Sequence, residues 1–313
     1  MEAWGEFEAG KRDKLDVQRF SLHLFDNLFE LQQLIATGQY RHGPYERFVV
    51  SDPKKRIIHK ASVRDRVLHR ALYRLLYPFF DRTFIADSYS CRVGKGTHLS
   101  LDRFTVLARR ASHNHKHTVW VLKGDIRKFF ASINHAVLLA LLWSHIPDRS
   151  LRRLLATVVE SFSTLPGTGL PLGNLTSQLF CNVYLNQFDQ FVKHKLKAEY
   201  YQRYADDFVI MSCDKSWLEQ LLPLLEQFLW ERLRLQMHPD KVWIKTVASG
   251  VDFLGWVHFP YHRVLRQSTK RRMLAAVAGG SVKTMHSYLG MLTHGNALKL
   301  TAEVETTYYL FNS

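Results

Sequence analysis

The chain has 313 residues, of which 46% are hydrophobic, and its formal net charge at pH 7 is +15. This apolar content can bury a sizeable core, which excludes a disordered chain, and the length suggests two or three compact subdomains. So positive a charge indicates a polyanionic partner, and nucleic acid is favoured over an anionic membrane surface.

The cysteines and the first residues indicate the compartment. Cys91, Cys181 and Cys213 are odd in number and show no paired CxxC spacing, so we expect neither disulfides nor structural zinc. The chain does not start with a basic region followed by an apolar one, and no apolar run approaches a membrane span. We therefore expect a cytoplasmic protein with no membrane partner. The histidine-rich residues 113–117 are interpreted as a solvated loop.

The first elements in chain order are a helix and a basic segment. Residues 13–36 predict one amphipathic helix, which Gly38 ends. Residues 39–74 then carry ten Lys or Arg against three acids, more than a balanced helix face holds. The ten are Arg41, Arg47, Lys54, Lys55, Arg56, Lys60, Arg64, Arg66, Arg70 and Arg74.

The middle of the chain predicts a strand followed by helices. The apolar run 119–124 is typical of a buried strand, and it ends at Asp125. Residues 135–163 predict helical structure, residues 167–174 form a loop rich in Gly and Pro, and a new helix is expected over about 175–197.

Two short β-prone runs come next, over 200–203 and 208–212, and they predict a hairpin. A helix with apolar spacing over 218–229 and a short strand over 242–246 follow it. Strand, helices, hairpin, helix, strand is the order of a split βαβ unit.

The tip of the predicted hairpin carries two adjacent carboxylates, Asp206 and Asp207. The flanking residues are apolar, and ionised carboxylates in a half-buried position are costly unless they are paired or bind a metal. A strand that ends at Asp125 beside this hairpin would gather hard oxygen ligands that suit Mg²⁺. Two such ions, about 4 Å apart, bind the attacking and leaving oxygens of a phosphoryl transfer.

Residues 253–302 contain no acidic residue but seven basic ones. These are Arg263, Arg266, Lys270, Arg271, Arg272, Lys283 and Lys299. Such a bias can neutralise a phosphate backbone, so we favour a surface that grips a nucleic-acid duplex over a solvated basic face. We expect the nucleic acid to be contacted by Arg266, Lys270, Arg271 and Arg272.

Five motifs, in order across roughly residues 40–300, resemble those of reverse transcriptases, particularly prokaryotic ones related to group II introns. They are Asp125-Ile126-Arg127-Lys128-Phe129-Phe130, Gly169-Leu170-Pro171-Leu172-Gly173, Tyr204-Ala205-Asp206-Asp207, His238-Pro239-Asp240-Lys241 and Phe253-Leu254-Gly255-Trp256. The resemblance implies an RNA-directed DNA polymerase that acts on template RNA, primer, cDNA and dNTPs with two Mg²⁺ ions, for which Mn²⁺ can substitute.

The resemblance also implies a fold, an α+β right-hand polymerase with fingers, a split βαβ palm and a helical basic thumb. On this basis residues 1–38 are an N-terminal helical extension and residues 39–118 the fingers. Residues 119–252 are the palm, with a finger-like helical insertion over 135–168. Residues 253–313 supply the primer grip and the thumb.

For catalysis, the resemblance assigns Asp125 and Asp206 to both metals, with Ile126 also in the metal site. Asp207 is a weaker ligand or a charge support. Lys241 is the group that would protonate the leaving pyrophosphate, although a surface lysine at a turn is the alternative interpretation.

For substrate binding, Arg56 and Arg92 resemble the fingers residues that clamp the triphosphate, since Arg suits phosphate oxygens. Phe130 would place a ring where a 2′-hydroxyl would clash, with core packing as the alternative and Phe129 as the competitor. Gly173 lets the backbone approach the base pair closely. The remaining assignments are Leu172 and Gln178 beside the nucleotide, and Phe253, Leu254, Gly255 and Trp256 in the primer grip.

The loop Leu172-Gly173-Asn174-Leu175-Thr176-Ser177-Gln178 differs from that of most group II relatives, which begin it with Gln-Gly and end it with Ser-Pro. It is similar to the loop of reverse transcriptases from diversity-generating retroelements. Those enzymes copy a template-repeat RNA with errors at adenines, aided by a small basic accessory protein. Leu172 in place of a polar residue would weaken base selection by hydrogen bonding.

Three alternatives compete with this interpretation. A retron-like or defence-associated reverse transcriptase shares the catalytic motifs. An RNA-binding scaffold with an inactive palm is disfavoured by the three aspartates, and an RNA-templated RNA polymerase by Phe130 and Ala205. We expect any ribonuclease H, endonuclease or integrase activity to come from partners, because few residues follow the expected thumb.

Overall fold

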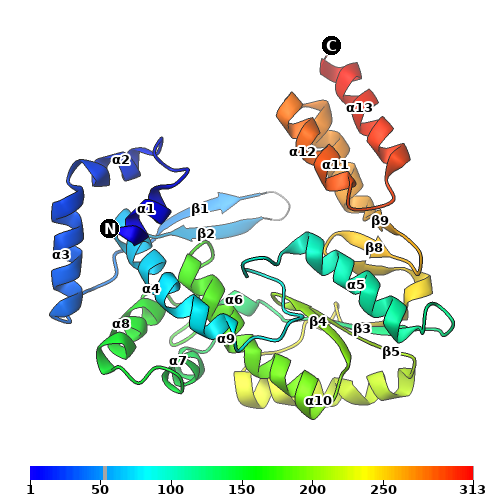
Figure 1. Ribbon diagram of the computed structural model, residues 1–313, viewed down its shortest axis with the longest axis horizontal. Coiled ribbons are helices and arrows are strands. Elements are labelled where there is room, and N and C mark those ends of the chain that lie inside the picture. Colours follow the sequence, from blue (N-terminus) through cyan, green and yellow to red (C-terminus); the bar gives the residue numbers. More distant parts are fainter. Residues whose placement is uncertain (52–54, 313) are drawn as a thin grey trace.

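The N-terminal part of the chain is helical (Figure 1). The structure is a computed structural model that describes residues 1–51 and 55–312, so Asp52 and Lys54 of the basic segment lie outside the described residues. The first helices are α1 (Glu2–Glu8), α2 (Leu15–Leu22) and α3 (Leu24–Ala36).

The single helix expected over 13–36 is wrong, because the chain leaves helical geometry at His23, with φ −121° and ψ 41°. The Asn27 side chain donates a hydrogen bond to the Phe20 carbonyl (2.9 Å), and so satisfies one of the acceptors left free where α2 ends. Asn is a residue that often makes such local side-chain contacts with the backbone.

A two-stranded hairpin and two long helices follow. They are β1 (Glu46–Val50), β2 (Arg56–Lys60), α4 (Val63–Asp81) and α5 (Thr97–Ala111). The hairpin is antiparallel and β1 is exposed along its whole length. Helix α4 is capped by Ser62, the residue before it, whose side chain accepts a hydrogen bond from the Asp65 amide.

A four-stranded antiparallel sheet lies at the centre of the fold, in the order β4-β5-β3-β6. Its strands are β3 (Trp120–Asp125), β4 (Tyr200–Tyr204), β5 (Asp207–Ser212) and β6 (Trp243–Thr246). Alternation along the strands directs Leu122 and Ile210 to one core cluster and Val121 and Val209 to another. The strand and hairpin predictions agree with this sheet.

Helices cover both faces of the sheet (Figure 1). α5 packs with the cluster of Val121, while α9 and α10 pack with the cluster of Leu122. The helices between the strands are α6 (Phe129–Ser132), α7 (His135–Trp143), α8 (Arg149–Glu160), α9 (Leu175–Gln190) and α10 (Lys215–Leu233). The helical stretch expected over 135–163 is thus two helices, because Asp148 caps a new start by accepting from the Leu151 amide at 2.6 Å.

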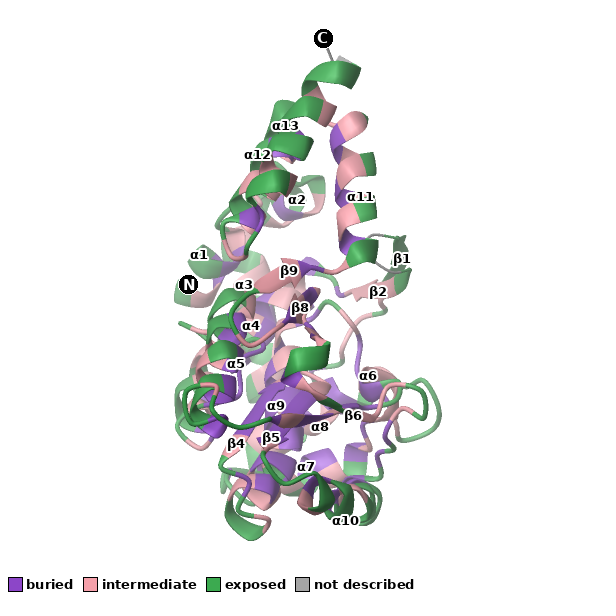
Figure 2. Cartoon of the chain, turned by 90° about the vertical axis from the view of Figure 1, so that its right-hand side faces the viewer, coloured by how far each residue is buried: buried purple, intermediate pink, exposed green. Residues whose placement is uncertain are grey.

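The C-terminal part stands away from this body (Figure 2). A three-stranded sheet, β7 (Val251–Phe253), β8 (Trp256–His258) and β9 (Arg263–Leu265), leads into α11 (Gln267–Ala278), α12 (Val282–Leu292) and α13 (Leu298–Asn312). The helices pack around Met273, Val277 and Val304. Across the described residues, no helix combines the length and apolarity that crossing a membrane would need.

Candidate active site

The sheet brings the three predicted carboxylates to one edge. Asp125 is the last residue of β3 and pairs in register with Asp207. Asp207 also pairs with Tyr204, which leaves Ala205 and Asp206 as a two-residue turn between β4 and β5. The hairpin and the strand predicted from the sequence therefore place Asp125, Asp206 and Asp207 together.

The turn has an unusual backbone at its first residue, because Ala205 has φ +53°. Two-residue hairpin turns need a positive φ at this position, which Gly adopts freely and an L-residue does not. A side chain there costs about 1 kcal/mol, so contacts with the surrounding fold must hold the turn.

The surroundings of Asp206 and Asp207 disfavour the charged form of both carboxyl groups. Burial, and then the charges of Asp207 and Asp125, raise the pKa of Asp206 to about 6. Burial is also the main cause that raises the pKa of Asp207. Each raised pKa means that the anion is disfavoured until a cation binds.

Two lysines supply part of the compensating charge. Lys241 Nζ donates to Asp125 Oδ1 at 2.9 Å, where the sequence-based assignment expected a lysine, and Lys123 Nζ lies 3.5 Å from Asp207 Oδ1. Lys123 was missed, although strand alternation places residues 123 and 125 on the same face of the sheet. Its ammonium also donates to the carbonyl of Asp252 in β7, at 3.1 Å.

The donor set fits a hard divalent cation, because carboxylate oxygens with raised pKa values gain most from such an ion. In the part of the chain that the structure describes, no three His, Cys, Asp or Glu side chains form a group that could hold a metal ion. In this structure Asp125 and Asp207 instead form ion pairs with Lys241 and Lys123.

Phe130 is on α6, which begins four residues after Asp125. It is half-buried, whereas Phe129 is only 2% exposed and belongs to the core. Of the two rings, Phe130 is therefore the one with an accessible face. The Leu170 amide donates to the Phe130 carbonyl at 2.8 Å, which joins α6 to the loop before α9. Gln178 is half-buried in the first turns of α9.

That loop is fastened to the hairpin strand β2. The His59 amide donates to the Leu172 carbonyl at 3.0 Å, and the Asn174 side chain donates to the His59 carbonyl at 2.9 Å. Gly173 has φ +103°, and a Cβ there would come within 2.7 Å of Ile58 Cγ2. Gly173 thus permits a close approach of the hairpin, a contact that sequence reasoning did not anticipate.

The two arginines expected to clamp a triphosphate differ. Arg56 is exposed at the start of β2. Arg92 is half-buried with a side chain that is only 7% exposed, and its Nε donates to Asp81 Oδ1 (2.7 Å) and its Nη1 to the carbonyls of Ile85 (2.7 Å) and Ser88 (3.1 Å). Arg92 therefore contributes its hydrogen bonds to the fold. Of the two arginines, Arg56 alone is exposed, as binding to a triphosphate requires.

The expected primer grip is a tight turn between β7 and β8. Leu254 and Gly255 form it, both with positive φ, of +51° and +86°. Phe253 and Trp256, on either side, are buried, and the Phe253 ring packs 5.7 Å from that of Phe104. Of these four residues, Leu254 and Gly255 are half-buried, while the two aromatic side chains attach the turn to the core.

The expected nucleic-acid contacts lie around the start of α11: Arg266, Lys270, Arg271 and Arg272. Arg266 pairs with Asp252, and Lys270 Nζ lies 2.7 Å from Glu303 Oε2. Both acids lie just outside the stretch 253–302, so its positive charge is partly neutralised within the fold. Arg271 is exposed and Arg272 is half-buried.

The basic segment 39–74 is also partly neutralised, in this case by the N-terminal helices. Arg66 Nη2 donates to Asp16 Oδ2 at 2.5 Å, and Arg74 pairs with Glu2 and Glu6. The charge excess seen in the sequence is therefore smaller on the surface of α4 than the composition suggests.

Comparisons with known proteins find relatives that span most of the chain. The chain is 24% identical over 303 residues to protein YkfC from Escherichia coli, with 84% of this chain and 77% of that protein covered. It is 22% identical over 307 residues to the group II intron-encoded protein LtrA from Lactococcus lactis, with 74% of this chain and 49% of that protein covered. It thus spans about half the length of LtrA.

Solved structures show the same fold. Apo telomerase from Candida tropicalis matches with a TM-score of 0.56 at 10% identity, covering 86% of this chain and 57% of that one. Telomerase from Candida albicans in complex with a telomeric RNA fragment matches with a TM-score of 0.53, covering 88% and 57%. The right-hand polymerase fold expected from the sequence is confirmed. The reverse transcriptase (RNA-dependent DNA polymerase) model matches residues 51–258, and the chain therefore belongs to the reverse transcriptase family.

Proposed function

We propose that this protein synthesises DNA on an RNA template by two-metal-ion nucleotidyl transfer, at the edge where β3 meets the β4–β5 hairpin. The observation that supports this most is the pairing of Asp125 with Asp207, beside an Asp206 whose pKa is raised to about 6. Bound divalent ions would stabilise the attacking and leaving oxygens of the transfer. Mg²⁺ is the proposed ion, with Mn²⁺ as a substitute.

The roles of the surrounding groups follow from their positions. Asp125 and Asp206 would hold the ions, with Ile126 beside them, since the Ile126 amide donates to the Asp206 carbonyl at 3.2 Å. Asp207, which faces Lys123, is better suited to charge support. Lys241 would change partner from Asp125 to the leaving pyrophosphate and donate a proton to it.

The nucleotide would lie between α6 and the hairpin. The accessible face of Phe130 would exclude a 2′-hydroxyl, and Arg56 would bind phosphate oxygens. The loop of Leu172 and Gly173, tied to β2, would contact the nascent base pair, with Gln178 behind it. The turn of Leu254 and Gly255 would support the primer strand.

The proposed division of the chain follows these roles. Residues 1–38 form an N-terminal extension, 39–118 the fingers, 119–252 the palm with the insertion 135–168, and 253–313 the primer grip and thumb. Strand β7 begins at Val251 and pairs with β8, which favours a boundary two residues earlier than 253.

We further propose the error-prone subtype found in diversity-generating retroelements, which copies a template-repeat RNA with the aid of a small basic accessory protein. The motif from Leu172 to Gln178 supports it. An apolar Leu172 leaves base selection to shape, which discriminates less well than buried hydrogen bonds. A retron-like or defence-associated enzyme is the alternative.

Deep sequencing of cDNA separates the two. The full-length protein, with its accessory partner, is given an RNA template and dNTPs. Errors concentrated opposite template adenines, and reduced there by Leu172→Gln, would support the proposed subtype. Equal error rates opposite all four bases would refute it and favour the retron-like alternative.

A further inference from the structure

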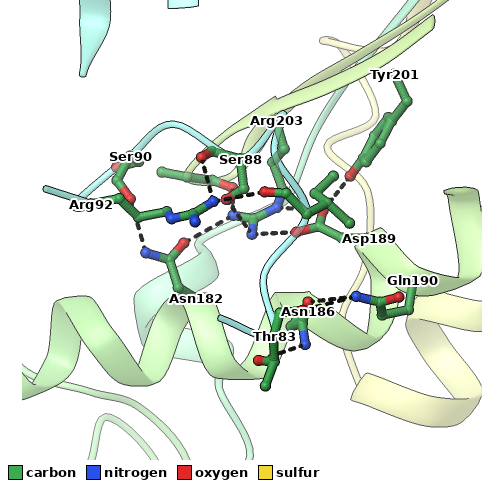
Figure 3. A network of polar contacts seen from close by, with 12 residues as sticks. Thr83, Ser88, Ser90, Arg92, Asn182, Asn186, Asp189, Gln190, Tyr201 and Arg203 are labelled. Carbon is green, nitrogen blue, oxygen red and sulfur yellow. Dashed lines mark hydrogen bonds and ion pairs between the residues drawn. The ribbon is translucent and has the colours of Figure 1, made fainter. Parts of the chain in front are cut away.

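Arg203, on β4 two residues before the Ala205-Asp206 turn, is completely buried. Its Nε and Nη2 donate to the two carboxylate oxygens of Asp189 on α9, at 2.7 and 2.6 Å (Figure 3). This is the bidentate geometry that only an arginine can offer. The Tyr201 hydroxyl donates to the same Asp189, at 2.6 Å.

The remaining donors of Arg203 reach three further groups. Nη2 donates to Ser88 Oγ at 3.0 Å, and Nη1 donates to Asn182 Oδ1 at 3.4 Å. Nη1 also donates to the carbonyl of Ala205, at 3.0 Å. The guanidinium therefore contacts α9 through Asp189 and Asn182 and the segment around Ser88 (Figure 3), and it is also bound to the turn through the Ala205 carbonyl.

The backbone of Arg203 and the side chain of Asn182 are themselves held by further hydrogen bonds. The Arg203 amide donates to the Asp87 carbonyl at 2.9 Å, and the Tyr89 amide donates to the Arg203 carbonyl at 3.0 Å. The Asn182 side chain donates to the Ser90 carbonyl at 2.9 Å. An arginine held in this way cannot rotate without breaking contacts to three separate segments.

The contact with Ala205 acts on the peptide unit that carries the Asp206 amide. Because that unit is planar, fixing its carbonyl fixes the direction in which the chain enters Asp206. The next peptide is fixed as well, by the hydrogen bond from the Ile126 amide to the Asp206 carbonyl. Both peptide units around Asp206 are thus anchored, in a turn strained by the positive φ of Ala205.

We propose that Arg203, anchored by Asp189, is a positioning residue that holds the strained turn and aims the Asp206 carboxylate for metal binding. The inference rests on the proposed function, because in that function Asp206 binds a metal ion. A buried ion pair often stabilises a protein no more than apolar side chains of similar volume would. A role in positioning therefore accounts better than stability for the location of the Arg203–Asp189 pair beside the turn.

The first test is Arg203→Lys, which keeps the charge but cannot bind both Asp189 oxygens and the Ala205 carbonyl at once. We expect kcat for dNTP incorporation to fall about 10- to 100-fold, while KM for dNTP changes little. Electron paramagnetic resonance should show weaker Mn²⁺ binding by the protein without nucleic acid. Hydrogen exchange should show faster exchange in the peptide that covers residues 203–208.

Tyr201→Phe is the matched control. It removes a hydrogen bond to the same Asp189 from a side chain that is equally buried and whose hydroxyl donates to that carboxylate, whereas Arg203 also donates to the Ala205 carbonyl. It should lower thermal stability without changing Mn²⁺ affinity or exchange in the turn. If Arg203→Lys does not fold, Asp189→Asn weakens the same Arg203–Asp189 contact, and the same measurements are made on that variant.

Ala205→Gly gives a second, independent readout. Glycine removes the strain at positive φ, so the effect of Arg203→Lys on Mn²⁺ affinity should be smaller in the Ala205→Gly background than in the wild type. Equal effects in both backgrounds would overturn the proposal. So would an Arg203→Lys protein that loses stability but keeps wild-type Mn²⁺ affinity and turn exchange.

These readouts separate the two proposals. A wild-type protein that makes no DNA on RNA would contradict the proposed function. Mn²⁺ affinity and exchange in the turn, compared between Arg203→Lys and Tyr201→Phe, would still decide whether Arg203 positions the turn.

Discussion

Asp206 is destabilised as an anion by the same surroundings that suit it to a divalent cation. Burial and the neighbouring Asp207 and Asp125 raise its pKa to about 6, above the ordinary value of 3.8. Protonation in the folded state therefore contributes stability that is fully present below pH 3.8 and is lost as the pH rises through 6. Without metal, the charged carboxylate costs stability at neutral pH.

We predict that Asp206→Asn, which removes this charge, makes the metal-free protein more stable at pH 7.5. The gain in the free energy of unfolding relative to wild type should grow by about 1 to 3 kcal/mol between pH 4 and pH 7.5. Urea unfolding in the presence of a chelator measures it. A difference between variant and wild type that does not depend on pH would contradict the cause assigned here.

Phe130 is the second residue whose surroundings lead to a prediction. Its ring is half-buried while Phe129 is in the core, so Phe130→Val should open space at the 2′ position and raise the rNTP-to-dNTP incorporation ratio. Single-nucleotide extension measures the ratio. Phe129→Leu is the comparison, and it should affect stability instead. An unchanged ratio in the Phe130 variant would place the gate elsewhere.

At the scale of elements, the strands of the palm could be predicted from the sequence, because alternation and apolar runs decide them locally. Asp125 at a strand end and Asp206 at a hairpin tip were found in this way. The break at His23 was not, because it depends on one side-chain contact from Asn27. The structural role of Arg92 was also missed, since two of its acceptors are backbone carbonyls, of Ile85 and Ser88, which every residue carries and which no sequence motif marks.

The contact between β2 and the loop before α9 gives a prediction at this scale. Gly173→Ala would strain a positive φ and press against Ile58, so it should lower the free energy of unfolding by about 1 to 3 kcal/mol. Gly167→Ala is the matched control, since Gly167 also has a positive φ, of +71°, but has open space around it. Chemical unfolding of both proteins isolates the steric part. Equal losses would mean that the hairpin adjusts freely to the loop.

At the scale of the whole molecule, the net charge of +15 is unevenly available. Acids from the N-terminal helices pair with arginines of α4, and Asp252 and Glu303 pair with residues of the C-terminal basic cluster. The composition correctly indicated a basic protein, but not which charges are presented, because ion pairs between distant segments cannot be read from one sequence.

We predict that binding to an RNA–DNA duplex weakens steeply with salt. Neutralising Arg266, Lys270, Arg271 and Arg272 together should reduce the slope of log affinity against log salt, because each phosphate contact releases counterions. Arg271→Ala alone should reduce it more than Lys270→Ala, since Glu303 already faces Lys270. Fluorescence anisotropy over a salt series measures the slopes. An unchanged slope in the fourfold variant would make this cluster a solvated face.

The central claim, DNA synthesis on RNA by the carboxylates at the palm edge, is tested most directly by primer extension. The wild type and the Asp206→Asn, Asp207→Asn protein are given a primed RNA template, dNTPs and Mg²⁺, and RNA binding is measured in parallel. We predict extension by the wild type, and none by the double variant, which should still fold and bind RNA because its basic surface is intact. Extension by the double variant at the wild-type rate would contradict the account.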